Sequence, residues 1–271
     1  MPAYPPSVRT LRSPSVRPQE DRHFVTALAR GLAVLSCFRF GDKFLGNQEI
    51  AQRCELPKST VSRLTTTLTR LGYLIHIEES GKYRLGTATL ALGTAMLVRL
   101  DERQVARPAM QELADFAMAE VSLGTRDRLS MIYVENCRSP VLLTQSLNVG
   151  SRIALATSAM GRAWLADLAE DQRQAIMAQL RARNAKAWPD VLQGIEKALQ
   201  DYRTLGVACS FGNWQKGVNA IARVFRPGRG LPSMVINCGG PSFNVSPEFL
   251  LGEVRPRLID MVSRLEAALH R

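Results

Sequence analysis

Residues 47–86 read NQEIAQRCELPKSTVSRLTTTLTRLGYLIHIEESGKYRLG, and this stretch decides the fold of the N-terminal part of the chain. Asn47 can cap a short helix, and the residues ELP at 55–57 predict a turn after it. A second helix is expected over Lys58–Leu71, because Gly72 can end it in the left-handed conformation. Two helices joined by a short turn are the core of a helix-turn-helix.

The flanking sequence adds a helix before this pair and a hairpin after it. Apolar residues at helical spacing begin at Phe24 and run to about Phe38. Segments 73–77 and 82–85 alternate and are rich in strand formers, and the residues EESG between them predict a hairpin. This order is typical of a winged helix-turn-helix, which we predict over residues 24–86.

The second helix carries the candidate DNA contacts. A helical wheel places Val61, Leu64, Leu68 and Leu71 on the inward face. The opposite face mixes hydroxyls with arginine and has no acid, which suits a helix lying in the major groove. A merely solvated face is the alternative, but such a face usually carries glutamate as well. The predicted contacts from this helix are Lys58, Ser59, Thr60, Ser62, Arg63, Thr66 and Arg70.

The hairpin is interpreted as the wing. Lys82 and Arg84 alternate with Tyr83 and Leu85, so one face is basic and the other apolar. We therefore add Lys82 and Arg84 as candidate contacts to the DNA backbone. The acidic tip of the hairpin argues against deep insertion.

The charge distribution favours a polyanionic partner. The chain of 271 residues has a net charge of +11. Residues 1–100 hold 14 basic and 7 acidic side chains, against 21 and 17 in residues 101–271. The basic excess is thus concentrated where the helix-turn-helix is predicted. No apolar stretch is long enough to span a membrane, so DNA is the expected partner and a membrane is not.

Residues 1–23 lack the apolar core of a secretory signal and are rich in proline and arginine. We interpret them as a disordered basic arm, and an extension without a role stays the alternative. The five cysteines form no CxxC pair and the three histidines lie far apart. We expect a reduced, cytoplasmic protein with neither a metal nor a cofactor.

Residues 87–104 are predicted to form a linker helix, and residues 105–271 a second domain. There, short alternating segments such as 121–126, 129–136, 141–146, 218–225 and 233–237 read as strands, with helices between them. We expect an α+β domain around a mostly antiparallel sheet.

Several stretches resemble the IclR-type bacterial regulators, which are named for the isocitrate lyase regulator. The resemblance covers about residues 24–268 and is strongest in ALARGLAVLSCF, EIAQRCELPKSTVSRLTTTLTRLGYL and GKYRLG. Weaker pieces are ARPAMQELA, VGSRIALATSAMGRAWLA, VNAIARVF and INCGGP. The resemblance implies a GAF-like effector-binding domain that binds a small organic acid or aromatic molecule. It also implies homodimers or dimers of dimers on palindromic operators, controlling a neighbouring catabolic operon.

Family effector pockets lie between the central sheet and the loop before the SAMGRAWLA helix. Carried over position by position, the effector-binding residues implied here are Ser158, Met160, Gly161, Asn219, Ala220, Asn237, Cys238 and Gly239. Better-studied members that bind small carboxylates tend to have cysteine and serine on these strands, and this departure argues against glyoxylate- or pyruvate-type ligands. The asparagines are also suited to satisfying buried backbone groups, Met160 to filling the core, and Cys238 to being a small buried residue.

Two other functions are alternatives to this interpretation. An enzyme is disfavoured, because the chain has no GxSxG, P-loop or GxGxxG motif and no histidine near a candidate nucleophile in sequence. A DNA-binding oligomeric regulator with a degenerate, ligand-free sensor domain stays the alternative to a ligand-responsive regulator.

Overall fold

The computed structural model describes residues 23–39, 41–140, 147–228 and 230–270. The predicted arm, except His23, and the predicted strand 141–146 lie outside these residues. Contacts divide the chain into two compact units, Met1–Arg99 and Leu100–Arg271. Each unit is described by itself.

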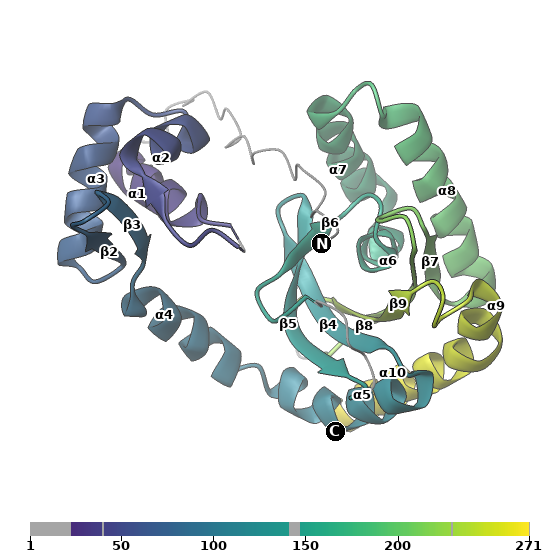
Figure 1. Cartoon of the computed structure of the whole chain (residues 1–271). Helices are drawn as coiled ribbons and strands as arrows, with labels where there is room; N and C mark the ends of the chain where they lie inside the picture. The colour runs from purple at the N-terminus through teal and green to yellow at the C-terminus, as the bar shows by residue number, and fades with distance from the viewer. Residues whose placement is uncertain (1–22, 40, 141–146, 229, 271) are drawn as a thin grey trace. The chain divides into compact units, whose positions relative to one another are not determined.

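The N-terminal unit has the predicted order of elements (Figure 1). Its sheet has the order β1-β3-β2, and both strand pairs are antiparallel. Val34, Ile50, Val61, Leu68 and Tyr83 belong to the buried core that joins the helices to this sheet. The elements are α1 (Thr26–Ser36), β1 (Leu45–Gly46), α2 (Asn47–Cys54), α3 (Lys58–Arg70), β2 (Leu74–Ile77), β3 (Lys82–Leu85) and α4 (Thr87–Val98).

The start of α2 differs from the prediction by one residue. Gly46, not Asn47, is the N-cap, and the backbone N–H of Gly46 donates to the Glu49 carboxylate at 2.8 Å. Asn47 instead uses its side-chain oxygen to accept from the Thr65 hydroxyl at 3.2 Å. This bond explains why Thr65 is fully buried in α3 although it is polar.

The predicted inward face of α3 was partly wrong. Val61 and Leu68 are buried and Leu64 is half-buried, as predicted, but Leu71 is 61% exposed. The helix ends at Arg70, and Gly72 follows with φ +77°, so Leu71 has already left the helical wheel. The apolar residues Leu28 and Leu32 of α1 reach solvent although they have helical spacing, and so does Phe24, which lies before the helix.

The C-terminal unit is built on a six-stranded sheet of order β6-β5-β4-β9-β8-β7, in which every neighbouring pair is antiparallel. The mixed helix and strand content and the antiparallel sheet confirm the predicted fold class. The elements are α5 (Asp101–Ala117), β4 (Glu120–Asp127), β5 (Ser130–Arg138), β6 (Arg152–Ala154), α6 (Ala159–Asp167), α7 (Glu170–Arg183), α8 (Trp188–Leu205), β7 (Ala208–Phe211), β8 (Val218–Phe225), β9 (Met234–Pro241), α9 (Pro247–Phe249), the π-helical turn η1 (Leu250–Val254) and α10 (Arg255–Leu269).

Helices cover both faces of this sheet (Figure 1). Helices α6, α7 and α8 pack on one face through a core that includes Met160, Ile176 and Ile195. Helices α5 and α10 pack on the other face. The Glu135 carboxylate of β5 is buried there and pairs with Arg103 at 2.9 Å and Arg107 at 2.7 Å, so ion pairs fix α5 to the sheet.

The sequence missed the short strands β1, β6 and β7, because two to four residues carry too little alternation to be recognised. The predicted strand at 233–237 continues to Pro241. The segment 87–104 predicted as one linker helix is divided between α4, which ends at Val98, and α5, which begins at Asp101. The first turn of α5 carries Asp101 and Glu102, and acids in this position stabilise a helix N-terminus.

A stability prediction follows from the close packing of α6. A Cβ at Gly161 would lie 2.1 Å from the backbone oxygen of Leu155, which cannot move without shifting the chain. We expect Gly161→Ala to lower the free energy of unfolding by about 1–3 kcal/mol or more. Urea denaturation measures it. Gly252→Ala is the control, since no atom lies within 4 Å of its Cβ. Equal stabilities of the two variants would contradict the packing described for α6.

Candidate functional site

The outward face of α3 carries the predicted DNA contacts. Lys58, Ser59, Ser62, Arg63, Thr66 and Arg70 are exposed, and Thr60 is half-buried. No aspartate or glutamate occurs in α3. The structure thus brings these side chains onto one solvent-facing surface, which we call the α3 face.

The α3 face is held in place by contacts on the opposite side of the helix. Val61 and Leu68 enter the core, and the Thr65 hydroxyl, which donates to Asn47, also lies 3.0 Å from the backbone oxygen of Val61. Pro57 is the N-cap residue, and no side chain caps the first turn. The N–H groups at this end are therefore available to an oxygen ligand beside Lys58.

One hydroxyl on the α3 face is already engaged. The Thr66 hydroxyl donates to the backbone oxygen of Ser62 at 2.8 Å. Hydroxyls bonded in this way lie close to the helix, so they keep the surface shallow and leave the long arginine side chains as its protruding groups. Arg63 and Arg70 are the residues best placed to reach beyond the helix surface.

The wing presents two exposed cations. Lys82 lies opposite Ile77 and Arg84 opposite Ile75 in the hairpin. Tyr83 between them is buried and packs against His76, with ring centroids 4.9 Å apart. The alternation predicted for this strand holds at Lys82, Tyr83 and Arg84, whereas Leu85 is 43% exposed.

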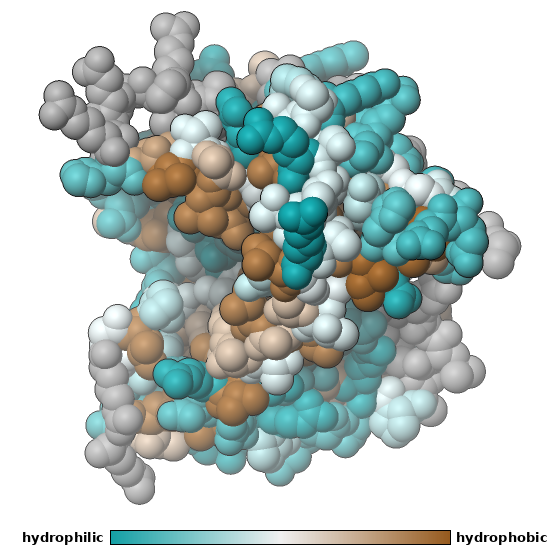
Figure 2. Space-filling view, turned by 90° about the vertical axis from the view of Figure 1, so that its left-hand side faces the viewer, coloured by the Kyte–Doolittle hydropathy of each residue, from teal (hydrophilic) through white to brown (hydrophobic). Residues whose placement is uncertain are grey.

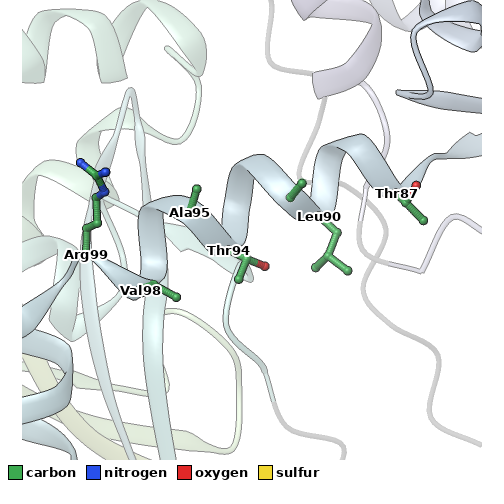
Figure 3. Close-up of a pocket in the computed structure, with 7 residues that line it drawn as sticks. Thr87, Leu90, Thr94, Ala95, Val98 and Arg99 are labelled. Atoms are coloured by element: carbon green, nitrogen blue, oxygen red, sulfur yellow. The ribbon is translucent and has the colours of Figure 1, made fainter.

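Helix α4 has no buried residue. A shallow depression of about 520 Å³ runs along it, and Figure 3 shows Leu90, Thr94 and Val98 among its lining side chains. Leu90 is 70% exposed and Val98 61%. Figure 2, which views the side where α3 and α4 appear in Figure 1, shows brown apolar surface between the polar side chains.

The predicted effector residues of the sheet divide between its two faces. Asn237 lies opposite Ala222 and Gly239 opposite Ala220, on the face that α6 and α8 cover. Cys238 and Asn219 alternate with them and therefore face α5 and α10. The Asn219 amide donates to the backbone oxygen of Val245 at 3.0 Å, so this side chain satisfies a buried backbone group.

The loop before α6 positions three more predicted residues. The Ser158 hydroxyl caps α6, accepting from the Gly161 N–H at 3.1 Å and donating to the Ala154 oxygen at 2.7 Å. Gly161 allows the helix to approach Leu155 closely. Met160 is fully buried, and its sulfur lies so close to Gly124 of β4 that a Cβ at this position would clash with it. The loop thus contacts the same face of the sheet as Asn237.

Sequence reasoning missed a polar cluster on this face. Ser122 of β4 lies opposite Asn237 on one side and Asn136 of β5 on the other. Its hydroxyl donates to the Asn136 side-chain oxygen at 2.8 Å, and Tyr133 lies beside Ser122 and Asn237. The Asn237 side-chain oxygen is buried and has no hydrogen-bond partner among the described residues. We call Glu120, Ser122, Tyr133, Asn136 and Asn237 the sheet cluster.

Arg138 connects the sheet cluster to the following loop. Its guanidinium lies 3.6 Å from the Glu120 carboxylate and donates to the Asn148 side-chain oxygen at 2.8 Å. The Asn136 amide donates to the Leu147 backbone oxygen at 2.6 Å. The signal that could have revealed the cluster is the spacing: Glu120 and Ser122, and likewise Asn136 and Arg138, alternate with apolar or buried residues.

Burial raises the pKa of Glu120 to about 7, and the neighbouring Arg138 and the hydrogen bonds from Ser122 and Asn136 offset only part of this rise. Near neutral pH the cluster therefore exchanges a proton. Burial also raises the pKa of the Tyr133 phenol, so this hydroxyl stays neutral.

A half-open cavity of about 670 Å³ lies elsewhere in this unit, between α8, α6 and β7. None of the predicted effector residues lines it. Its most buried charge is Arg162, which donates to the Cys209 oxygen at 3.0 Å and to the Asn213 side chain at 2.9 Å. These bonds connect α6 to β7, and they explain why a charged residue is buried at position 162.

Within the described residues, no group of three or more His, Cys, Asp or Glu side chains could hold a metal ion. In the same residues, the helices are too short or too polar for a membrane span.

Glu120 gives the unfolding free energy a pH dependence. Between about pH 4.5 and 7 the folded chain binds this proton more tightly than the unfolded chain, so stability falls as pH rises through this window. Glu120→Gln removes this pH dependence. As the pH rises from about 4 to about 8, we expect the unfolding free energy of the variant to increase by about 1–3 kcal/mol relative to that of the wild type. Urea titrations across this range measure it, with the exposed Glu196→Gln as control. A constant difference between Glu120→Gln and wild type would contradict the raised pKa.

Comparisons with known proteins agree with this architecture. Residues 27–76 match the IclR helix-turn-helix domain, and residues 94–265 match the Bacterial transcriptional regulator IclR C-terminal domain. The HTH-type transcriptional regulator TsaQ1/TsaQ2 of Comamonas testosteroni is 32% identical over 95% of this chain and 93% of its own length. An IclR family transcriptional regulator from Brucella abortus, known from its crystal structure, is 46% identical with a TM-score of 0.87, covering 92% of this chain and 94% of that one.

An IclR homolog of Microbacterium hydrocarbonoxydans, crystallised with 4-hydroxybenzoate, shares the fold with a TM-score of 0.70. It is 22% identical, over 90% of this chain and 99% of that one. The matched family consists of transcriptional regulators and not of enzymes. Both parts of the chain match the family, and a relative above 30% identity spans nearly its whole length, so the chain belongs to the IclR family of bacterial transcriptional regulators.

Proposed function

We propose that this regulator binds double-stranded operator DNA through the α3 face and the wing, and that a small molecule bound at the sheet cluster alters this binding. The observation that carries the effector part is the buried side-chain oxygen of Asn237 on a central strand, which has no hydrogen-bond partner among the described residues. An orphaned buried acceptor costs free energy until a donor reaches it. A hydroxyl group on a ligand supplies such a donor.

The surroundings of Asn237 narrow the ligand class. Ala220, Ala222 and Met160 are apolar neighbours on the same face, and Arg138 supplies a positive charge at its edge. A hydroxyl-bearing organic acid, aromatic or aliphatic, matches this combination of groups. The 4-hydroxybenzoate bound by the Microbacterium hydrocarbonoxydans homolog has these groups. We propose such an acid as the effector, and a neighbouring catabolic operon as the target.

Oligomer formation is part of the proposal. Helix α4 buries none of its side chains, and Leu90, Leu92, Met96 and Val98 are exposed along it. Leu28 and Leu32 of α1, with Phe24 just before this helix, add a second group of exposed apolar side chains. Exposed apolar groups of this kind favour burial against another chain. We propose a homodimer, alone or paired into a dimer of dimers, that presents two α3 faces to a palindromic operator in the cytoplasm.

The domain limits of the proposal are those expected from the sequence, with a DNA-binding domain at 24–86, a linker at 87–104 that comprises α4 and the first turn of α5, and an effector domain at 105–271. The alternative is a regulator whose sensor domain binds no ligand. The buried Asn237 side-chain oxygen, which has no hydrogen-bond partner among the described residues, favours a regulator that responds to a ligand.

Replacing Arg63 tests the DNA surface. We expect Arg63→Ala to weaken specific operator binding by about 1–3 kcal/mol, because a long exposed cation is lost from the centre of the α3 face. Titrations with a labelled operator fragment at fixed salt measure the loss. Arg30→Ala on α1 removes the same charge from an exposed position outside this face. Equal affinities for the two variants would place the DNA contact elsewhere.

Replacing Asn237 tests the effector site. Hydroxyl-bearing acids, with 4-hydroxybenzoate first, are screened by the shift they cause in the melting temperature of the wild-type protein. We expect Asn237→Leu to lose this shift and to keep its affinity for operator DNA. Asn244→Leu, at an exposed position of the same domain, keeps both. A shift retained in Asn237→Leu moves the site away from the sheet cluster, and a wild type that responds to no acid favours the ligand-free sensor.

A further inference from the structure

Two cysteines that lie 17 positions apart in the sequence come together in the N-terminal unit. Cys37 follows α1 directly, and Cys54 is the last residue of α2. The two thiols lie close enough for each to shift the pKa of the other, and the Cys54 sulfur donates to the Ala33 oxygen in the last turn of α1 at 3.6 Å. Both residues are half-buried and pack against the core of the unit.

The surroundings give the two thiols different acidity. The hydrogen bond from Cys37, helped by the positive charge of Arg53, lowers the pKa of Cys54 below its ordinary value. The hydrogen bond to Cys54 and burial raise the pKa of Cys37. Arg53 is itself held in place, since it donates to the Cys37 backbone oxygen at 3.0 Å and pairs with Asp42. Cys54 is thus suited to react as a thiolate, and Cys37 to stay a thiol beside it.

The other three cysteines have no such arrangement. Burial raises the pKa of Cys137 to about 11 and the pKa of Cys209 and Cys238 to about 12. All three are buried. Buried thiols with raised pKa values react slowly with oxidants, so they serve as internal controls.

We propose that Cys37 and Cys54 form a site of reversible oxidation, at which a hydroperoxide converts the two thiols into an intramolecular disulfide. The Cys54 thiolate attacks the hydroperoxide, the O–O bond breaks, and the released alkoxide takes a proton to leave as an alcohol, or as water from hydrogen peroxide. Cys54 becomes a sulfenic acid. The Cys37 sulfur then attacks Cys54, and the sulfenic oxygen leaves with two protons as water. A dithiol returns the pair to two thiols by exchange.

The disulfide would act on the helix that positions the α3 face. An S–S bond is about 2.05 Å long, shorter than any contact between two separate thiols. The closed loop contains β1 and α2, and α2 holds α3 through Asn47 and Thr65. Oxidation would therefore fix α2 against α1 and limit its motion.

The test uses the reduced full-length protein and hydrogen peroxide, followed by alkylation of the remaining thiols and peptide mass spectrometry. The expected product is a Cys37–Cys54 disulfide, lighter by two hydrogens and reversed by dithiothreitol, while Cys137, Cys209 and Cys238 stay reduced. Amide hydrogen exchange in α2 is expected to be slower in the oxidised protein. Oxidation confined to the three buried cysteines, or no disulfide between Cys37 and Cys54, would overturn the proposal.

Two variants separate the roles of the thiols. In Cys37→Ser, Cys54 stops at the sulfenic acid, which a dimedone probe captures. In Cys54→Ser, the Cys37 thiol is expected to react about tenfold or more slowly, because burial still raises its pKa when the Cys54 thiol is gone. Cys137→Ser is the control and keeps the disulfide. Equal rates for Cys54→Ser and wild type would show that Cys54 is not the attacking thiol. The wild-type experiment decides the proposal if either variant fails to fold.

Discussion

The alternation of side chains across the central antiparallel sheet is the constraint on which the C-terminal half depends. Each strand presents successive residues to two different layers of helices. In β5 this places the Glu135 carboxylate against Arg103 and Arg107 of α5, while its neighbour Asn136 faces the sheet cluster. One strand therefore contacts both the sheet cluster and α5, which follows the α4 helix along the chain. A ligand that reorders the cluster would act on a strand whose other face is anchored to α5.

The same alternation separates structural polar residues from available ones. Asn219 and Asn237 look alike in the sequence, and both are buried. The Asn219 amide donates to the Val245 backbone oxygen, whereas the Asn237 side-chain oxygen has no hydrogen-bond partner among the described residues. Arg162 is likewise buried, but neutral oxygens of three segments accept its hydrogen bonds. Polar burial alone thus does not define a site, and the unsatisfied atom is the more useful indicator.

In the DNA-binding half, the orientation of α3 depends on a few local contacts. The Asn47–Thr65 hydrogen bond and the packing of Val61 and Leu68 fix one side of α3, so its acid-free side faces solvent. The nearby Cys37 and Cys54 belong to the same core, and chemistry at these thiols bears on the helix that supports α3. The exposed apolar residues of α1 and α4 leave this half with surface that the single chain does not bury.

The sequence by itself determined the winged helix-turn-helix, the composition of the α3 face and the family, because these depend on local periodicity, turn residues and continuous motifs. It also indicated the longer strands and the antiparallel, mixed character of the second domain. It could not assign sheet faces, since the register of β8, β9 and β4 decides which of Asn219, Asn237 and Cys238 share a surface. Nor could it show that Glu120 and Ser122 meet Asn136, or that Cys37 meets Cys54, because such contacts join residues far apart in the chain. Only tertiary structure brings those groups close enough to share hydrogen bonds and shift each other's pKa values.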